Sequence, residues 1–294
     1  MVIKLNYKAI IAVMISILIC VNLLVFSKEK AMQGNSIEAE EKIIPIVMYH
    51  SILINNRRGA SNTITPNELE SDLKYIKENG YTTILMNDLI GFVNGRNQLP
   101  EKPIIITFDD GFLNNYVYVL PMLKKYDMKA TLSIIGVCTD QFTLVRSNDL
   151  EYAHLSWYQV SEMVESERFE ILNHTYNLHK SDEKRVGTKK KFGEALSLYD
   201  QIISDDIGGF QLQINDKIGY TPNTFVYPFG SMSKESVEIL KKLGFEASLS
   251  TDGGINKISN NAGKLFGLKR NDRPHGMSSK SFFKKMYGIS GMTE

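Results

Sequence analysis

The sequence predicts an α/β fold, because strand-like and helix-like segments alternate along the chain and the helices between the strands have clear starts. Short apolar runs, the kind that form parallel strands covered on both faces, recur from residue 43 onward. The runs that we expect to be strands are residues 43–49, 81–86, 103–108, 129–135, 169–173, 223–227, 245–250 and 264–269. About eight strands with intervening helices favour a (β/α) barrel or a variant of one, and a doubly wound open sheet is the alternative.

Capping residues show where several of the intervening helices begin. Thr65 and Ser156 each stand three residues before a Glu or Gln, which is the pattern of a capping box. Pro66 follows Thr65 at the first helical position, where its missing N–H costs nothing. A third helix is expected to start at the SKES segment, residues 233–236, and to end at Gly244.

The N-terminal segment predicts a membrane anchor. Residues 9–26 are apolar and uncharged, follow two lysines, and are about long enough to cross the hydrocarbon core of a bilayer. The basic flank predicts that the rest of the chain lies outside the cell. A cleaved signal peptide, which would give a secreted protein, is the competing interpretation, although no A-x-A site follows the run. We therefore expect a cytoplasmic N-terminus and anchor over residues 1–26, a linker over 27–42 and one domain over 43–294.

Charge and cysteine content narrow the class of protein. Lys plus Arg (34) nearly balances Asp plus Glu (33), so no broad basic surface for nucleic acid is expected. At 294 residues and 43% hydrophobic content the chain can form a single large domain with a substantial core. Cys138 is the lone cysteine of the expected external domain, so that domain has no internal disulfide.

Chemically reactive residues follow several of the predicted strands. In a (β/α) barrel the active site lies where the strands end, at the C-terminal face. Three of the five histidines and an adjacent pair of carboxylates fall at or near such positions. The residues in question are His50, Asp109, Asp110, His174, His179, Pro228, Phe229, Gly230, Thr251 and Asp252.

Two histidines and a carboxylate, with coordination positions left open, make a metal site that can activate water. His174 and His179 are five residues apart, and on a straight helix they would be rotated by about 140° from each other. They can meet if His174 ends a strand and His179 lies on a loop that folds back, with Asn177 as a turn former. Two unrelated surface histidines are the alternative, which the neighbouring Asp109–Asp110 pair makes less favourable.

Three motifs together resemble one known family. ITFDDG (106–111), NHTYNLH (173–179) and FVYPFG (225–230) have the order and approximate spacing seen in the polysaccharide deacetylase family, the NodB-homology domain. These enzymes remove N-acetyl groups, and in some members O-acetyl groups, from sugar polymers. The resemblance covers most of residues 43–272, and VMYHSI (47–52) with the five-residue histidine spacing is most similar to the poly-N-acetylglucosamine deacetylase branch. It implies a distorted, TIM-barrel-like (β/α) barrel of about seven or eight strands.

The resemblance also implies which residues act at the site. Asp110, His174 and His179 would bind a divalent metal, usually Zn²⁺, and Asp109 would be the general base. The backbone N–H after the motif proline, that of Phe229, would stabilise the oxyanion. The remaining residues expected at the site are Thr175, which would orient the metal loop through its hydroxyl, and the substrate-facing Tyr227, Pro228 and Asp252, although Asp252 could equally be a turn residue.

Two features depart from the family pattern. FVYPFG lacks the arginine that commonly precedes the proline motif and pairs with the catalytic aspartate. Either Arg270, which we group with the substrate-facing residues, replaces that arginine, or Asp109 is tuned differently. The general acid that protonates the leaving amine is also unassigned, and the candidates are His275, near the C-terminus, and His50.

The predicted function is metal-dependent removal of N-acetyl groups from a cell-wall or extracellular polysaccharide that contains N-acetylglucosamine. The alternatives are an O-acetyl (xylan-type) esterase of the same fold and a catalytically inactive carbohydrate-binding relative. A glycoside hydrolase fits poorly, because its two carboxylates flank the sugar from different strands whereas Asp109 and Asp110 are adjacent.

Overall fold

The computed structural model describes residues 41–55, 62–182, 185–259 and 265–289. They belong to one compact unit, Glu41–Glu294. The predicted anchor over residues 9–26 and the linker up to residue 40 lie outside the described residues. Within the described ranges, no helix combines the length and the apolar composition needed to cross a membrane.

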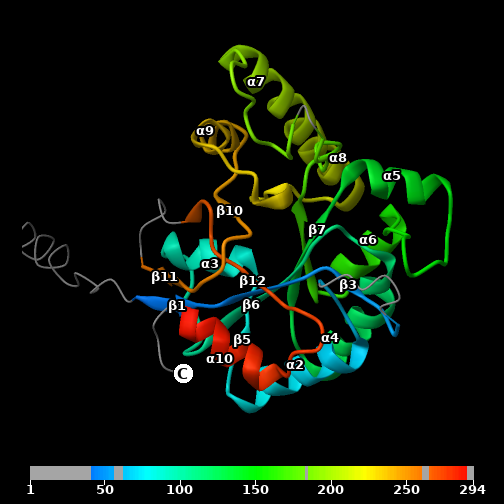
Figure 1. Cartoon of the computed structure of the whole chain (residues 1–294), viewed down its shortest axis with the longest axis vertical. Helices are drawn as coiled ribbons and strands as arrows, with labels where there is room; N and C mark the ends of the chain where they lie inside the picture. Colours follow the sequence, from blue (N-terminus) through cyan, green and yellow to red (C-terminus); the bar gives the residue numbers. More distant parts are fainter. Residues whose placement is uncertain (1–40, 56–61, 183–184, 260–264, 290–294) are drawn as a thin grey trace, which may run out of the picture. The chain divides into compact units, whose positions relative to one another are not determined.

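A curved parallel sheet forms the centre of this unit (Figure 1). Seven strands follow one another in the order β10-β9-β8-β7-β6-β2-β12, and β5 pairs with the beginning of β6. The strands are β2 (Ile46–Tyr49), β5 (Thr82–Thr83), β6 (Pro103–Phe108), β7 (Ala130–Ile134), β8 (Phe169–Asn173), β9 (Thr224–Val226), β10 (Ala247–Leu249) and β12 (Asn271–Asp272). The predicted α/β class is therefore confirmed, and the sheet is a curled half-barrel of seven strands.

One extended segment near the C-terminus connects the two ends of the strand order. Leu268 bridges to Leu249 of β10, and a few residues later Asn271 pairs with Val47 of β2. The side chains between these two points, including that of Arg270, are therefore brought to the strands that carry the other candidate site residues.

The prediction of a strand over residues 264–269 was wrong. Leu265–Gly267 form a short turn, and the strand lies further on, at Asn271–Asp272. Gly267 has a φ of +73°, which interrupts the extended backbone, while Leu265 and Leu268 are buried in the sheet interior. The run is apolar because it packs there, and not because it forms a strand.

The other strand boundaries shift by a few residues. The predicted strand 43–49 is divided at Pro45 into β1 (Lys42–Ile44) and β2, and 81–86 contracts to β5 because α3 begins at Met86. Three short strands were not predicted: β3 (Ser51–Ile52) pairs with β4 (Thr63–Ile64), and β11 (Asn256–Ile258) pairs with β1.

Three helices begin at the predicted caps. Thr65, Ser156 and Ser233 each cap a helix, and all three ends are capping boxes. These helices are α2 (Pro66–Glu78), α6 (Trp157–Glu165) and α9 (Lys234–Lys242). The others are α3 (Met86–Val93), α4 (Leu120–Tyr126), α5 (Gly136–Leu144), α7 (Leu196–Ile203), α8 (Gly209–Ile218) and α10 (Ser279–Ile289), with π-helical turns η1 (Asn115–Val119) and η2 (Ser204–Gly208) and the 3₁₀ turn η3 (Pro228–Gly230).

The core has two layers separated by the sheet. Ile104, Ile106 and Phe108 of β6 pack among the outer helices, whereas Ile105, between them, packs in the interior with Leu172. This alternation follows from the two-residue period of a strand. It leaves the strand ends as the place where polar side chains can gather.

Glu170 is a buried carboxyl group of β8, outside the candidate site. It is 8% exposed, forms no ion pair within the described residues, and accepts a hydrogen bond from the Asn87 N–H of α3 at 3.3 Å. Burial raises the pKa of Glu170 from 4.5 to about 7, despite that hydrogen bond.

We expect Glu170→Gln to stabilise the protein at neutral and alkaline pH but not below about pH 4.5. Because the folded-state pKa is raised, the folded protein binds the proton more tightly, so wild-type stability is full below about pH 4.5 and falls as pH rises through about 7. Gln keeps the acceptor without the charge, so the unfolding free energy of the variant at pH 8 should exceed that of the wild type by about 3 kcal/mol. Urea unfolding at pH 4.5 and 8 tests this, and an equal difference at both pH values would contradict it.

Candidate metal and catalytic site

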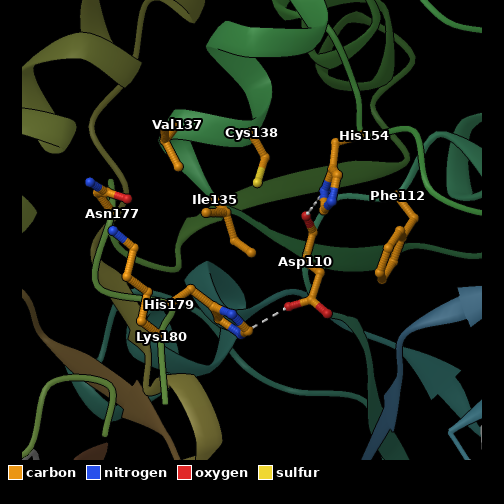
Figure 2. A pocket seen from close by; sticks show the side chains of 9 residues that line it. All are labelled: Asp110, Phe112, Ile135, Val137, Cys138, His154, Asn177, His179 and Lys180. Atoms are coloured by element: carbon orange, nitrogen blue, oxygen red, sulfur yellow. Dashed lines mark hydrogen bonds and ion pairs between the residues drawn. The ribbon is translucent and has the colours of Figure 1, made fainter. Parts of the chain in front are cut away.

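Asp110, His174 and His179 meet at the C-terminal end of the sheet. Asp110 follows β6, His174 follows β8, and His179 lies on the loop after His174. One ligand-capable atom from each residue lies within 4.8 Å of the others. The Nε2 atoms of His174 and His179 are 3.5 Å and 3.3 Å from Asp110 Oδ1, and Figure 2 shows the His179–Asp110 contact. The loop between the histidines therefore folds back as the sequence predicted.

A sharp turn at the end of β6 lets both aspartates enter the site. Asp110 and Gly111 have φ angles of +72° and +69°, in the left-handed region. A Cβ atom at position 111 would lie 2.9 Å from Ile134 Cγ2, so the position requires glycine for space as well as for backbone conformation. The strand alternation ends here, and Asp109 and Asp110 contact different partners.

The hydrogen bonds of His174 show that this cluster fits a cation. His174 Nδ1 is 2.8 Å from the carbonyl oxygen of Val226, which can only accept, so Nδ1 carries the proton and Nε2 presents its lone pair to Asp110 Oδ1. Asp110 Oδ1 is buried and has no hydrogen-bond partner among the described residues. The Nε2 lone pair of His174 and the Asp110 Oδ1 atom therefore face each other with no proton between them. A bound metal ion would accept electron pairs from both atoms.

The electrostatics of the cluster also favour a cation. Burial by itself raises the pKa of Asp110, but its contacts with His174 and His179 hold that pKa well below the ordinary range. Burial lowers the pKa of His179, yet the Asp110 carboxylate outweighs it and raises that pKa above 6.5. The Asp110 carboxylate is therefore ionised at neutral pH and attracts positive charge.

Asp109 is buried and paired with an arginine. The two terminal guanidinium nitrogens of Arg270 donate to the two carboxylate oxygens of Asp109, both at 2.8 Å, and the Ser133 hydroxyl donates to Oδ1 at 2.9 Å. Burial raises the pKa of Asp109, but the charge and the hydrogen bonds of Arg270 reverse the effect and lower it to about 2. Asp109 is therefore ionised at neutral pH.

The structure corrects the grouping of Arg270 with the substrate-facing residues. Its side chain is fully buried, and a further nitrogen donates to the Ser250 carbonyl at 2.8 Å, so it lies behind Asp109. Its position agrees with the other expectation, that Arg270 replaces the arginine missing from FVYPFG.

The two candidate acids occupy different surroundings. His50 follows β2, and its Nδ1 is 3.8 Å from Asp272 Oδ1 of β12. His275 is exposed, and its Nδ1 is 2.8 Å from Glu68 Oε2 at the start of α2. The structure thus brings His50 to the strand ends that carry the aspartates and joins His275 to a helix cap. Asp272 could not be predicted as a partner of His50, because the last strand lies at Asn271–Asp272 and not at the apolar run 264–269.

The FVYPFG motif meets the site at two points, the Val226 carbonyl that accepts from His174 and the residue Phe229. Phe229 has a φ of +57°, is 48% exposed, and its ring centroid lies 4.6 Å from that of His179. Tyr227 is fully buried and accepts a hydrogen bond from Ser236 of α9 at 3.2 Å. Pro228 is buried too, so the expectation that Tyr227 and Pro228 face substrate does not agree with the structure.

Thr175 is buried beside the candidate cluster, whereas Asp252 is exposed after β10. The Thr175 hydroxyl is buried without a hydrogen-bond partner among the described residues, so no such bond supports its expected role in orienting the loop. Its backbone has a φ of +73°, and its N–H donates to Asn173 Oδ1 at 2.9 Å. Asp252 follows β10 with an exposed side chain, and its carbonyl accepts the Arg270 N–H at 2.9 Å.

A cleft of about 370 Å³ opens over the candidate metal-binding cluster of Asp110, His174 and His179 (Figure 2). Its lining residues are Asp110, Phe112, Ile135, Val137, Cys138, His154, Asn177, His179 and Lys180. Burial raises the pKa of the Cys138 thiol to about 11, so it stays protonated at neutral pH and is a poor metal ligand.

His154 braces the turn that carries Asp110, and the sequence analysis gave it no role. Its Nδ1 donates to the carbonyl oxygen of Asp110 at 2.8 Å, and its ring stacks on Phe112 with centroids 4.8 Å apart. The only sequence signal was its place just before the Ser156 helix cap, which does not indicate a contact with a residue 44 positions away.

The comparison with known protein families decides the classification. Residues 96–248 match the family model described as polysaccharide deacetylase, which is more than half of the chain. The chain belongs to the polysaccharide deacetylase family. The matched region includes Asp109, Asp110, His174, His179 and Phe229.

Curated relatives of this deacetylase-family protein include N-deacetylases. The chain is 26% identical over 223 residues to the poly-beta-1,6-N-acetyl-D-glucosamine N-deacetylase of Escherichia coli (strain K12), covering 67% of this chain and 32% of that protein. It is 24% identical over 202 residues to the enzyme of the same name from Staphylococcus epidermidis, covering 69% of this chain and 66% of that protein. The chain thus spans about a third of the length of the first relative.

Solved structures share the fold. The Streptococcus pyogenes deacetylase PplD in complex with acetate matches with a TM-score of 0.69 at 22% identity, covering 84% of this chain and 99% of that chain. A de-N-acetylase from Aggregatibacter actinomycetemcomitans matches with a TM-score of 0.67 at 24% identity, covering 83% of this chain and 100% of that chain.

Proposed function

We propose that this protein is a metal-dependent hydrolase that removes N-acetyl groups from a cell-wall or extracellular polysaccharide containing N-acetylglucosamine. The observation that carries the proposal is the Asp110–His174–His179 cluster beside the ionised Asp109. The relatives named as N-deacetylases support an amide substrate. The chemistry needs a polarised carbonyl and an activated water, and this arrangement suits both requirements.

Asp110, His174 and His179 would hold the metal, and their oxygen and nitrogen donors suit Zn²⁺. When bound, a Zn²⁺ ion supplies a Lewis acid for the acetyl carbonyl and lowers the pKa of its water ligand. The three protein ligands leave a coordination position for these groups. Asp109 stands beside the cluster as a carboxylate, held by Arg270 in a fixed orientation.

The chain's own residues then account for the proton transfers. Asp109 accepts the proton of the attacking water as general base. The backbone N–H of Phe229 donates to the oxyanion, and the ring of Phe229 closes one side of the site against His179. His50 protonates the leaving amine, and its Nδ1 lies 3.8 Å from Asp272 Oδ1. Asp252 contacts the polysaccharide from the exposed end of β10.

Acetate release from defined substrates tests the proposal. We expect the protein to release acetate from polymers of N-acetylglucosamine or from peptidoglycan but not from acetylxylan, to lose this activity after chelation and to regain it with Zn²⁺. Release from acetylxylan alone would indicate the O-acetyl esterase. Stoichiometric metal without acetate release from any substrate would indicate an inactive carbohydrate-binding relative.

We also propose that residues 9–26 anchor the protein in the cell membrane with the catalytic domain outside, on the grounds of their length and basic flank. Cell fractionation with protease accessibility is expected to recover the full chain in the membrane, with its C-terminal domain cleaved from outside. Recovery of the full chain in the cytoplasm would contradict this, and a shorter form in the medium would indicate a cleaved signal peptide.

A further inference from the structure

The loop from His174 to His179 is held by Asp206, a residue that lies outside the metal-binding cluster. The Tyr176 N–H donates to Asp206 Oδ1 at 2.8 Å, and the Asn177 N–H donates to Oδ2 at 2.9 Å. One carboxylate thus accepts hydrogen bonds from two consecutive amides in the middle of the loop. Charge-assisted bonds of this kind are stronger than bonds between neutral groups.

Asp206 belongs to the π-helical turn η2, which interrupts the helix between α7 and α8. Such turns are rare and often occur near functional sites, because the extra residue changes the direction in which side chains point. A second link joins the same turn to the loop. Asn173 donates through Nδ2 to the carbonyl of Ile207 at 3.2 Å and accepts the Thr175 N–H through Oδ1 at 2.9 Å.

Other contacts also hold the loop, among them a hydrogen bond from the Tyr176 hydroxyl to Asp140 Oδ2 at 3.1 Å. The carbonyl groups of Thr175 and Tyr176 accept the N–H groups of Gly136 and Val137 at 3.1 Å and 2.9 Å, which fixes one side of the loop. Thr175 has a left-handed φ of +73°, and its hydroxyl has no hydrogen-bond partner among the described residues. The other side of the loop is held by backbone N–H groups, which donate hydrogen bonds to the side chains of Asn173 and Asp206.

We propose that Asp206 is a positioning residue that sets the metal affinity of the site. It does not take part in the cluster itself. By fixing Tyr176 and Asn177, it fixes the fold-back that brings His179 to Asp110, so its loss lets the second imidazole drift from the metal. The inference rests on the metal site of the proposed function.

The test is the Zn²⁺ dissociation constant of the full-length protein with Asp206→Asn, measured by competition with a chromophoric chelator. The amide keeps the shape of the side chain but presents an NH₂ group to one of the two loop N–H groups. We expect the affinity to fall by about 10- to 100-fold, the usual range for residues that orient metal ligands. Asp205→Asn, in the same turn with an exposed side chain, is the matched control and should bind as the wild type does.

Two further readouts separate positioning from a general loss of structure. The acetate-release rate of Asp206→Asn should return towards the wild-type rate at saturating Zn²⁺, and its metal-free unfolding temperature should stay close to that of Asp205→Asn. Wild-type affinity in Asp206→Asn overturns the inference, as does a rate that added metal does not restore. If Asp206→Asn does not fold, Asp206→Ser provides the measurement, and wild-type affinity there also overturns it.

A His179→Ala variant keeps this inference distinct from the proposed function. Loss of metal in His179→Ala together with wild-type affinity in Asp206→Asn refutes the role of Asp206 alone. Wild-type affinity in His179→Ala refutes the metal site itself.

Discussion

Asp109→Asn is expected to keep the metal but to lower the rate of acetate release by about 10²-fold or more, because the general base is lost. The variant should also be less stable than the wild type, because the buried Arg270 loses its anionic partner. The pKa of about 2 that Arg270 helps to impose keeps Asp109 ionised at neutral pH, whereas asparagine cannot accept a proton. Asp110→Asn, the matched change at the next residue, is expected to lose metal and activity together, since Asp110 faces both histidines.

Metal content and acetate release are measured for both variants after each is shown to be folded. The two variants should differ in metal content, with metal retained in Asp109→Asn and lost in Asp110→Asn. Loss of metal from Asp109→Asn with retention in Asp110→Asn would mean that the two roles are reversed. Full activity in both variants would refute the deacetylase mechanism.

Arg270→Met is expected to destabilise the fold by about 3–5 kcal/mol at neutral pH, because it leaves the buried Asp109 carboxylate without its cation. In the wild type the lowered pKa of Asp109 stabilises the fold above about pH 4, and this contribution is lost as pH falls through about 2. In the variant, burial raises the pKa of the carboxyl group, so stability should increase as pH falls and the group takes up a proton.

Urea unfolding of the single variants and of the Asp109→Asn/Arg270→Met double variant checks this prediction. Removing both charges should recover much of the stability that Arg270→Met loses. A double variant no more stable than Arg270→Met would show that the guanidinium acts through packing rather than through its charge. A stability loss that is the same at pH 5 and pH 8 would lead to the same conclusion.

The sequence by itself determined the α/β class, most of the central strands, three helix starts and the residues of the candidate metal-binding cluster. These features depend on short-range information. Apolar runs bounded by turn residues define strands, and Thr65, Ser156 and Ser233 cap helices through residues three positions away. The cluster could be predicted because a (β/α) topology collects the strand ends at one face, whatever the details of packing.

Only the tertiary structure decided which side chains partner that cluster. Arg270 reaches Asp109 across 161 residues, and Asp272 reaches His50, because the segment after Leu268 crosses from β10 to β2. The apolar run 264–269 predicts the last strand too early, so this register cannot be derived from the sequence. A shift of one residue would turn every side chain to the opposite face. Tyr227 likewise contacts α9 rather than the cleft, because helix packing decides which face of its strand is covered. The sequence identifies reactive residues at strand ends, but strand register and helix packing decide which of them meet.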